Sequence, residues 1–150
     1  MILSGTDPTF QKKADVVSCF IQNDLNEILL LHRQLSKSSG GKWGLPAGKV
    51  ELGETLGDAI IREIFEETGC KFTAPELTYL DTVNVRHGSG KEVFDFGYHV
   101  YRINLDNTPA ITINDAEHQA YMWVSLDEAL EMDLVEDQGD VQEMFTALLK

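Results

Sequence analysis

The sequence predicts an α/β fold in which a mixed β-sheet is held between helices. Strand-like apolar patterns occupy residues 14–32 and 77–103, and helical patterns occupy residues 56–68 and the C-terminal segment from about residue 139. This order of strands, helix, strands and helices is typical of a layered α/β domain. At 150 residues the chain is expected to form one domain, 1–150, which is long enough to bury roughly two-thirds of its unfolded surface.

The first two predicted strands are residues 14–22 and 27–32. Residues 23–26 read Asn-Asp-Leu-Asn, a composition typical of a turn, so the two strands are expected to form a hairpin. A polar loop follows at residues 36–41.

A second strand pair is predicted at residues 77–86 and 93–103, joined by a flexible tip at residues 87–91. An irregular acidic stretch at 106–117 leads to a short strand at 121–124. Ser125 and Glu128 then have the spacing of a capping box, which predicts a helix start.

The helix at residues 56–68 carries the most informative pattern. Thr55 is a plausible N-cap, and Gly69 is suited to the left-handed position that ends a helix. At 3.6 residues per turn, three acidic side chains share one face: Glu63, Glu66 and Glu67. The other side is expected to hold Gly57, Ile60, Ile61, Ile64, Phe65 and Thr68 and to pack against the sheet.

Crowded like charges cost a helix roughly 0.2–0.5 kcal/mol per pair, so a ligand that offsets them is expected. A hard cation such as Mg²⁺ is bound by one or two carboxylates together with waters and substrate phosphates. The alternative is a solvated acidic face, which is the usual explanation of a Glu-rich helix. Arg62 and the glycine-rich loop before the helix are not needed for solvation, which favours the metal site.

These residues resemble the box of the Nudix hydrolases. The pattern consists of Gly48, five residues, Glu54, seven residues, Arg62-Glu63-Ile64, one residue, Glu66-Glu67, one residue and Gly69. Cys70 stands where the family usually has an aliphatic residue, and Ala47 stands where a second glycine is commoner. The resemblance implies the Nudix α/β/α sandwich, with a mixed β-sheet between helices, and a hydrolase that acts on phosphoric anhydride bonds.

The same resemblance implies roles for the box residues. The expected cofactor is Mg²⁺, with Mn²⁺ as the alternative, and its expected ligands are Glu63, Glu66, Glu67 and the backbone carbonyl of Gly48. Arg62 is expected to pair with a box carboxylate, and Glu54 is either a ligand or a stabiliser of the loop. The catalytic base is a helix glutamate or an acid from a later loop, and it stays unassigned.

Outside the box, Glu117 resembles a late catalytic acid of the family, with an exposed loop residue as the alternative. His118 is similar to a histidine placed near the leaving group in the sugar-nucleotide branch, although packing at the sheet edge is favoured. Arg33 and Lys49 resemble substrate-binding phosphate contacts, with solvated surface charges as the alternative. Four aromatic residues could stack on a base, but the strand pattern favours the core for most of them: Trp43, Phe94, Phe96 and Tyr98.

The composition of the chain limits the kinds of partner that it is expected to bind. A formal net charge of −13 argues against binding long nucleic acid, whose affinity comes largely from Lys and Arg contacts to phosphate. No apolar run approaches membrane length and no signal peptide is recognised, so no membrane partner is expected. Two cysteines, Cys19 and Cys70, are too few for a disulfide framework and favour a cytoplasmic location. The oligomeric state is left open, a homodimer included.

The sequence therefore predicts Mg²⁺-dependent hydrolysis of a nucleoside diphosphate linked to another moiety. A nucleoside triphosphate or modified dNTP is the first expectation for this small-molecule substrate. NDP-sugars, ADP-ribose and dinucleoside polyphosphates are the alternatives. Two alternatives of another class are a non-catalytic nucleotide-binding or regulatory Nudix module and an interaction protein whose acidic surface binds a basic partner.

Overall fold

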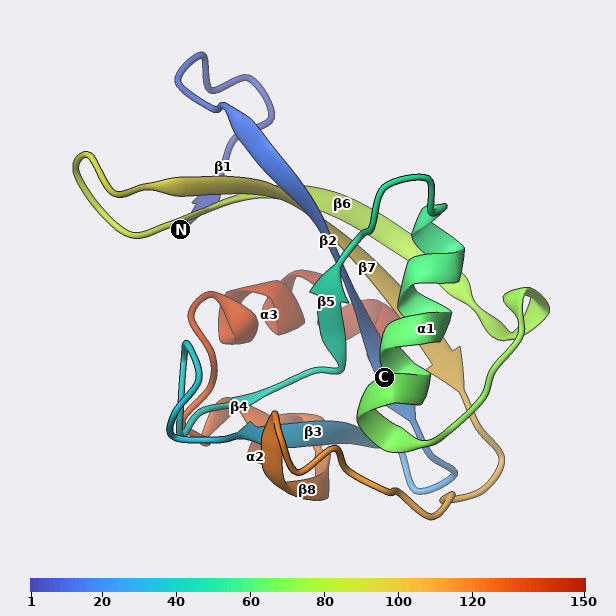
Figure 1. The fold of residues 1–150 in the computed structure, drawn as a ribbon. Helices are drawn as coiled ribbons and strands as arrows, with labels where there is room; N and C mark the ends of the chain where they lie inside the picture. The colour runs from blue at the N-terminus through green and yellow to red at the C-terminus, as the bar shows by residue number, and fades with distance from the viewer.

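A computed structural model describes residues 1–150 and shows a mixed sheet with helices on both faces (Figure 1). The main strand order is β1 (Ile2–Leu3), β6 (Thr78–His87), β7 (Phe94–Asn104), β2 (Lys12–Gln22), β3 (Glu27–Arg33) and β4 (Trp43–Gly44). Two further strands lie off this path: β5 (Ala47–Lys49) pairs with β2, and β8 (His118–Ser125) pairs with β3. The β2–β7 pair is parallel and the others are antiparallel, so the predicted mixed sheet is confirmed.

The first two predicted strands pair with each other only next to the turn that joins them, so the predicted hairpin is wrong for the rest of their length. β2 and β3 pair antiparallel only at Gln22 and Ile28. Farther along, the short strand β5 pairs with β2, and β4 pairs with β3. The edges of β2 and β3 that would pair with each other in a hairpin are therefore occupied by these two short strands. β2 instead runs beside β7 over its whole length, and the two predicted hairpin strands diverge (Figure 1).

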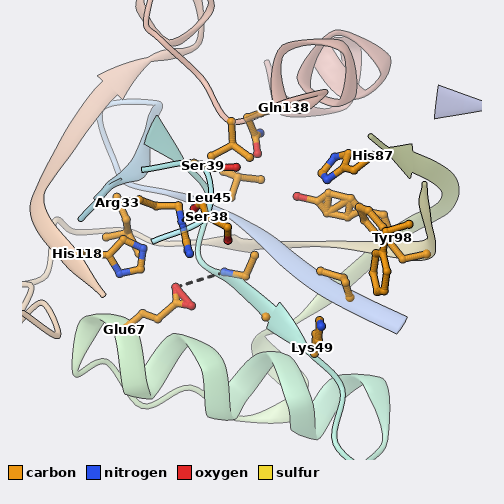
Figure 2. A pocket seen from close by; sticks show the side chains of 18 residues that line it. Arg33, Ser38, Ser39, Leu45, Lys49, Glu67, His87, Tyr98, His118 and Gln138 are labelled. Carbon is orange, nitrogen blue, oxygen red and sulfur yellow. Dashed lines mark hydrogen bonds between the residues drawn. The ribbon is translucent and has the colours of Figure 1, made fainter. Parts of the chain in front are cut away.

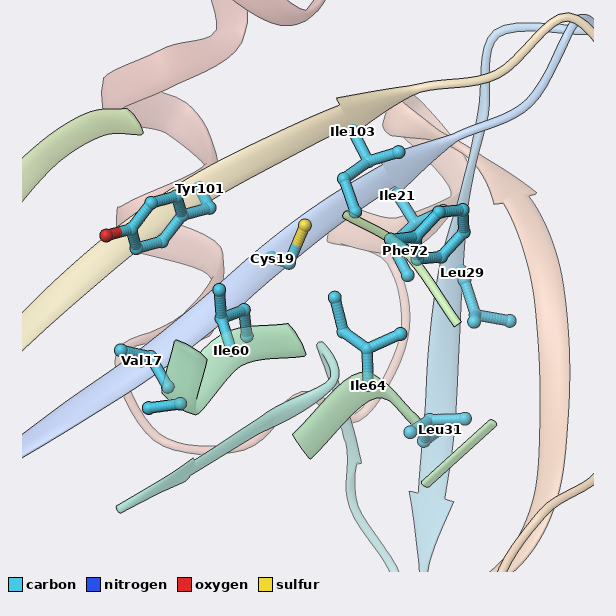
Figure 3. Close-up of a cluster of buried hydrophobic side chains, with 11 residues drawn as sticks. Val17, Cys19, Ile21, Leu29, Leu31, Ile60, Ile64, Phe72, Tyr101 and Ile103 are labelled. Carbon is cyan, nitrogen blue, oxygen red and sulfur yellow. The ribbon is translucent and has the colours of Figure 1, made fainter. Parts of the chain in front are cut away.

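The helices complete the α/β/α sandwich. α1 (Leu56–Thr68) covers one face of the sheet, and α3 (Gln138–Leu149) covers the other after the short helix α2 (Leu126–Leu130). On the α1 face, Ile60 and Ile64 pack with Cys19 and other strand residues (Figure 3). On the opposite face, Phe145 packs with Phe20 and Val100. A single 3₁₀ turn, η1 (Ala74–Glu76), links α1 to β6, and no helix combines the length and apolar composition needed to cross a membrane.

α1 begins and ends as predicted, but its faces differ from the prediction. The Thr55 hydroxyl accepts the Asp58 N–H at 3.1 Å, and Gly69 has a φ of 75°. Phe65, which was expected to pack, is 53% exposed, while Glu67 is only 3% exposed. Because Glu67 follows Ile64 by three positions and Ile60 by seven, it lies on the packed side of the helix.

Two other predicted elements change their length. The segment after β7 has no regular structure, as predicted, but β8 begins at His118 and not at residue 121. The tip between β6 and β7 is a turn in which Gly88 has a φ of 83° and Gly90 a φ of 63°. The last helix begins at Gln138, one residue before the expected start.

Candidate functional site

The loop before α1 approaches the helix so closely that it requires a glycine. A Cβ atom on Gly48 would lie 2.1 Å from the carboxylate carbon of Glu63. Gly48 lies in β5, whose pairing with Val17 of β2 holds it beside the helix. The first residue of the Nudix-like pattern therefore provides the space in which the Glu63 carboxylate lies.

Arg62 ties this loop to the helix. Its Nε and Nη2 donate to the two carboxylate oxygens of Glu54 at 2.6 and 2.9 Å, and its Nη1 donates to Glu63 at 2.8 Å. Nη2 also donates to the backbone carbonyl of Lys49 at 3.1 Å. These are the carboxylate contacts that the sequence predicted for Arg62. They lower the pKa of Glu54 to about 2, with help from the Glu51 N–H.

Glu67 is a buried carboxylate with little hydrogen bonding. Its one hydrogen bond is a long one of 3.3 Å from the Ala47 N–H. Burial, followed by the negative charge of Glu63, raises the pKa of Glu67 well above its ordinary value. Burial also raises the pKa of Glu63, although Arg62 opposes this. Two neighbouring acids are therefore held where negative charge is unfavourable.

The donor set fits a hard divalent cation. Carboxylate oxygens are the ligands that Mg²⁺ prefers, and it keeps several waters in addition. Glu63 and Glu67 supply such oxygens beside Gly48, and a cation there would offset their buried charge. In this structure no three His, Cys, Asp or Glu side chains converge closely enough to hold a metal between them. Glu66 is half-exposed and contacts Arg62 at 3.3 Å.

A cavity of about 440 Å³ opens beside Glu67 (Figure 2). Arg33 and His118 lie with Glu67 at one end of the cavity, and Lys49 lies toward the other end, where three aromatic rings line the wall. The cavity residues are Val16, Leu31, Arg33, Ser38, Ser39, Gly44, Leu45, Ala47, Gly48, Lys49, Glu67, His87, Phe94, Phe96, Tyr98, His118, Val135 and Gln138. Both predicted substrate-binding residues, Arg33 and Lys49, therefore line the same cavity as Glu67.

The two basic residues keep donors available to a ligand. Arg33 Nε donates to the carbonyl of Ser38 at 2.7 Å, which leaves the terminal nitrogens of its guanidinium without a protein partner. Lys49 Nζ lies 5.1 Å from the centre of the Phe94 ring, in the range of a cation–π contact. Both positions suit an anionic ligand that extends from the carboxylates toward the aromatic rings.

His118 lines the cavity near Glu67, and Glu117 is its neighbour in the chain. Glu117 is half-buried, and its charge helps to raise the pKa of Glu67, so the structure brings the two acids near each other. His118 is buried and its Nδ1 has no hydrogen-bond partner. Burial, followed by the charge of Arg33, lowers the pKa of His118 to about 4. His118 thus packs at the sheet edge, as the sequence favoured, and also lines the cavity.

The four aromatic residues pack in or against the core, as predicted for most of them, and three of them also border the cavity. Phe94, Phe96 and Tyr98 line the cavity, although Phe96 also packs against Val83. Their alternation along β7 was recognised, but the open space beside that face depends on where α3 begins. Trp43 lies outside the cavity and stacks on His32, with ring centres 4.3 Å apart.

Four polar cavity residues were not predicted: Ser38, Ser39, His87 and Gln138. Gln138 is the most informative, because it is 4% exposed and its amide nitrogen has no hydrogen-bond partner. It lies at the first position of α3, after Asp137, whose φ is 68°. No sequence motif marks it, and only the unpaired amide in the folded chain reveals it.

Known proteins share the sequence family and the fold of this chain. A family model described as the NUDIX domain matches residues 12–145. The CTP pyrophosphohydrolase of Escherichia coli K12 is 32% identical over 137 residues, which cover 91% of this chain and 94% of that protein. Putative nudix hydrolase 1 of Caenorhabditis elegans is 36% identical over 105 residues, covering 70% of this chain and 26% of that longer protein.

Among solved structures, the MutT protein from Methanosarcina mazei Go1 superposes with a TM-score of 0.75 at 29% identity, covering 95% of this chain and 99% of that one. The chain therefore belongs to the Nudix family, and it is a hydrolase of the class that acts on phosphoric anhydride bonds. The resemblance, the fold class and the enzyme class drawn from the sequence are thereby confirmed. The substrate and the roles of individual residues remain to be proposed.

Proposed function

We propose that this chain hydrolyses a nucleoside triphosphate to a nucleoside monophosphate and pyrophosphate, using Mg²⁺ or, as the alternative ion, Mn²⁺. The observation that carries the proposal is the two-ended cavity, with the buried carboxylate of Glu67 and the guanidinium of Arg33 at one end, and Lys49 and the aromatic rings at the other. A volume of about 440 Å³ is in the range of small-molecule sites. The name of the bacterial relative, a CTP pyrophosphohydrolase, supports the same substrate class.

The carboxylates and Arg62 would form the reactive end. Glu63, Glu67 and the Gly48 carbonyl would hold the cation, with Glu66 as a further ligand if it turns away from Arg62. When bound, a divalent cation offsets charge on phosphate oxygens and makes water more acidic. Arg62 keeps Glu63 and the loop in position through its hydrogen bonds to Glu54 and Lys49. Glu117, beside Glu67, would help to orient the attacking water.

The basic residues would position the triphosphate. The free nitrogens of Arg33 can donate to phosphate oxygens in the planar geometry that guanidinium provides. Lys49 would contribute a point charge from the opposite wall. Because the whole chain carries a net charge of −13, these two cations and the bound metal would supply most of the local attraction for an anionic substrate.

The aromatic end would hold the base. Phe96 and Tyr98 present flat apolar surfaces, on which a base can stack. The unpaired amide nitrogen of Gln138 can then donate to an acceptor on the edge of the base. A buried donor without a partner costs about 1–3 kcal/mol, so a base that pairs with it would be favoured over one that cannot.

One substrate panel tests the proposal. Initial rates with Mg²⁺ are measured for canonical and oxidised dNTPs, CTP, NDP-sugars, ADP-ribose and diadenosine polyphosphates, with detection of pyrophosphate and nucleotide products. A triphosphate should give the highest kcat/KM and release pyrophosphate. A preference for an NDP-sugar, ADP-ribose or a dinucleoside polyphosphate would reject the triphosphate assignment. Binding of nucleotides without any turnover would indicate a non-catalytic module.

We also propose that the enzyme acts in the cytoplasm, where nucleotide substrates are abundant. Both cysteines are free thiols, with Cys19 buried and Cys70 half-buried. Free thiols are usual in proteins of reducing compartments. Fractionation of the native organism's cells would test this location.

A further inference from the structure

β8 is an edge strand of the sheet. It pairs with β3 on one side and with no strand on the other. It spans eight residues, His118–Ser125, without an irregularity between Ala120 and Ser125. An open strand edge exposes backbone donors and acceptors that can pair with another chain.

The register of the sheet identifies the backbone groups at the open edge. The carbonyl of Glu27 and the N–H of Arg33 are bonded on the side of β3 that faces away from β8. Because backbone groups alternate in direction along a strand, Leu30 and His32 point toward β8, where they pair with Met122 and Ala120. The N–H and C=O groups of Tyr121 and Trp123 therefore point outward. No hydrogen bond reaches these outward groups from elsewhere in the chain.

The usual protections of an edge are missing from β8. Residues 119–124 include no proline, no lysine and no acidic residue. β6, at the opposite side of the sheet, does have such protections. Its pairing is irregular between Tyr79 and Asp81, Asp81 places an exposed charge on it, and β1 covers part of its edge. Tyr121 and Met122 are 43% and 45% exposed and lie on opposite faces of β8. An added strand would thus meet an apolar side chain on each face.

Charges at the two ends of β8 favour one kind of occupant. Exposed or half-exposed acids precede it at Asp115 and Glu117, and exposed acids follow it at Asp127 and Glu128. A second copy would pair antiparallel about a two-fold axis, which places Asp115 opposite Glu128 and the negative charges of both chains together. Basic residues at both ends of an incoming strand would meet opposite charges instead.

We propose that β8 binds an extended peptide segment by strand addition, and that the segment has an apolar centre flanked by Lys or Arg at both ends. Backbone hydrogen bonds to Tyr121 and Trp123 would supply affinity, and the acidic ends would select the partner. Glu117 and His118, at the start of this surface, also belong to the residues proposed for hydrolysis or to the cavity, whereas Tyr121 and Trp123 belong to neither. The test below changes only Tyr121, so it does not depend on that function.

The test measures fluorescence anisotropy with two labelled peptides. One is Lys-Arg-Val-Thr-Val-Thr-Val-Arg-Lys, and its twin carries Glu and Asp in place of the basic residues. The basic peptide should bind the full chain, more weakly as salt is raised, and the acidic twin should not bind. Tyr121→Pro removes an outward N–H that β3 does not use, so binding should weaken by about tenfold, as expected for the loss of one hydrogen bond.

Two further variants control for the possibility that Tyr121→Pro misfolds. Tyr121→Lys keeps the backbone N–H but adds a repelling charge and should also weaken binding, whereas Tyr121→Thr should bind nearly as the parent does. Circular dichroism and hydrolysis rates should be unchanged in all three. Equal binding of both peptides, or unchanged binding in both the Pro and Lys variants, would overturn the proposal. If sedimentation shows a dimer that Tyr121→Pro dissociates, the open edge of β8 binds a second copy of the chain, and the proposal of a basic peptide partner is overturned.

Discussion

Glu63 lies against Gly48 so closely that its carboxylate occupies the space of the missing side chain. Gly48→Ala should therefore displace Glu63 and its contact with Arg62. We expect a loss of about 1–3 kcal/mol in the free energy of unfolding, as for overpacked sites, and a fall in kcat/KM of about a hundredfold, as for misplaced catalytic groups. Gly5→Ala is the matched control, because a Cβ there meets nothing within 4 Å, and it should change neither value. A fully active Gly48→Ala enzyme would refute this account of the loop.

Glu67→Gln should separate function from stability. Without metal, the free energy of unfolding should stay level or rise by up to about 1 kcal/mol, because the variant removes a buried negative charge that repels Glu63. Turnover should fall by about a thousandfold or more, since a group that holds the cation is lost. Both are measured on one preparation, with Glu143→Gln on an exposed face of α3 as the control. Strong destabilisation with most of the rate retained would make Glu67 a structural residue.

Metal binding should be visible without any substrate. Mg²⁺ should raise the melting temperature by offsetting the charges of Glu63 and Glu67, and linkage gives about 2.7 kcal/mol at a concentration 100 times the Kd. The shift should shrink in Glu67→Gln, and EDTA should abolish turnover. Differential scanning calorimetry with and without Mg²⁺ provides the measurement. Unimpaired hydrolysis in saturating EDTA would exclude the proposed metal dependence.

The buried pair Arg86–Asp95 should give the protein an acid-sensitive contribution to stability. Arg86 donates to Asp95 at 2.6 and 2.8 Å, and these bonds, with one from the Gln11 N–H, lower the pKa of Asp95 to about 2. Because the pKa of Asp95 is lower in the folded than in the unfolded chain, ionised Asp95 stabilises the fold at pH values above its unfolded-state pKa of about 3.9. This stabilisation is lost as the pH falls toward 2. Asp95→Asn should be less stable than the parent at pH 7, and the difference should narrow between about pH 4 and 2. Urea unfolding at several pH values tests this, and a constant difference would contradict it.

Gln138 should set the choice of base. Gln138→Leu removes the unpaired amide, so the ratio of kcat/KM between the best and second-best triphosphates should change by about tenfold, the usual weight of one hydrogen bond. The melting temperature should change little or rise, because a buried polar group without a partner is removed. If the ratio of kcat/KM between triphosphates with different bases is unaltered, the base does not bind beside Gln138.

The local parts of the fold could be predicted from the sequence because neighbouring residues determine them. Thr55, Gly69 and the spacing of the glutamates were enough to place α1 and its acidic residues. The hairpin prediction failed because the pairing of β2 depends on β7, far away in the chain. The burial of Glu67 and the exposure of Phe65 likewise depend on where β5 lies against the helix.

The site was predictable where chemistry leaves a pattern in the sequence. Arg33, Lys49 and Glu67 were all named, and all three line the cavity. Gln138 carries no such pattern, because its importance comes only from being buried without a partner. Phe94, Phe96 and Tyr98 do pack with the core to which they were assigned, but alternation along a strand could not show that the same side chains border a cavity.

The parallel pairing of β2 with β7 has a consequence for how the chain folds. Gln22 and Asn104 are partners although they are 82 positions apart, so the centre of the sheet forms only after most of the chain has been synthesised. Such distant pairing is typical of slow folding. In the folded chain Ile60 and Ile64 of α1 pack with residues of both strands, among them Cys19 of β2 and Ile103 of β7. The packed side of α1, on which Glu67 lies, is therefore complete only in a chain whose two distant strands have paired.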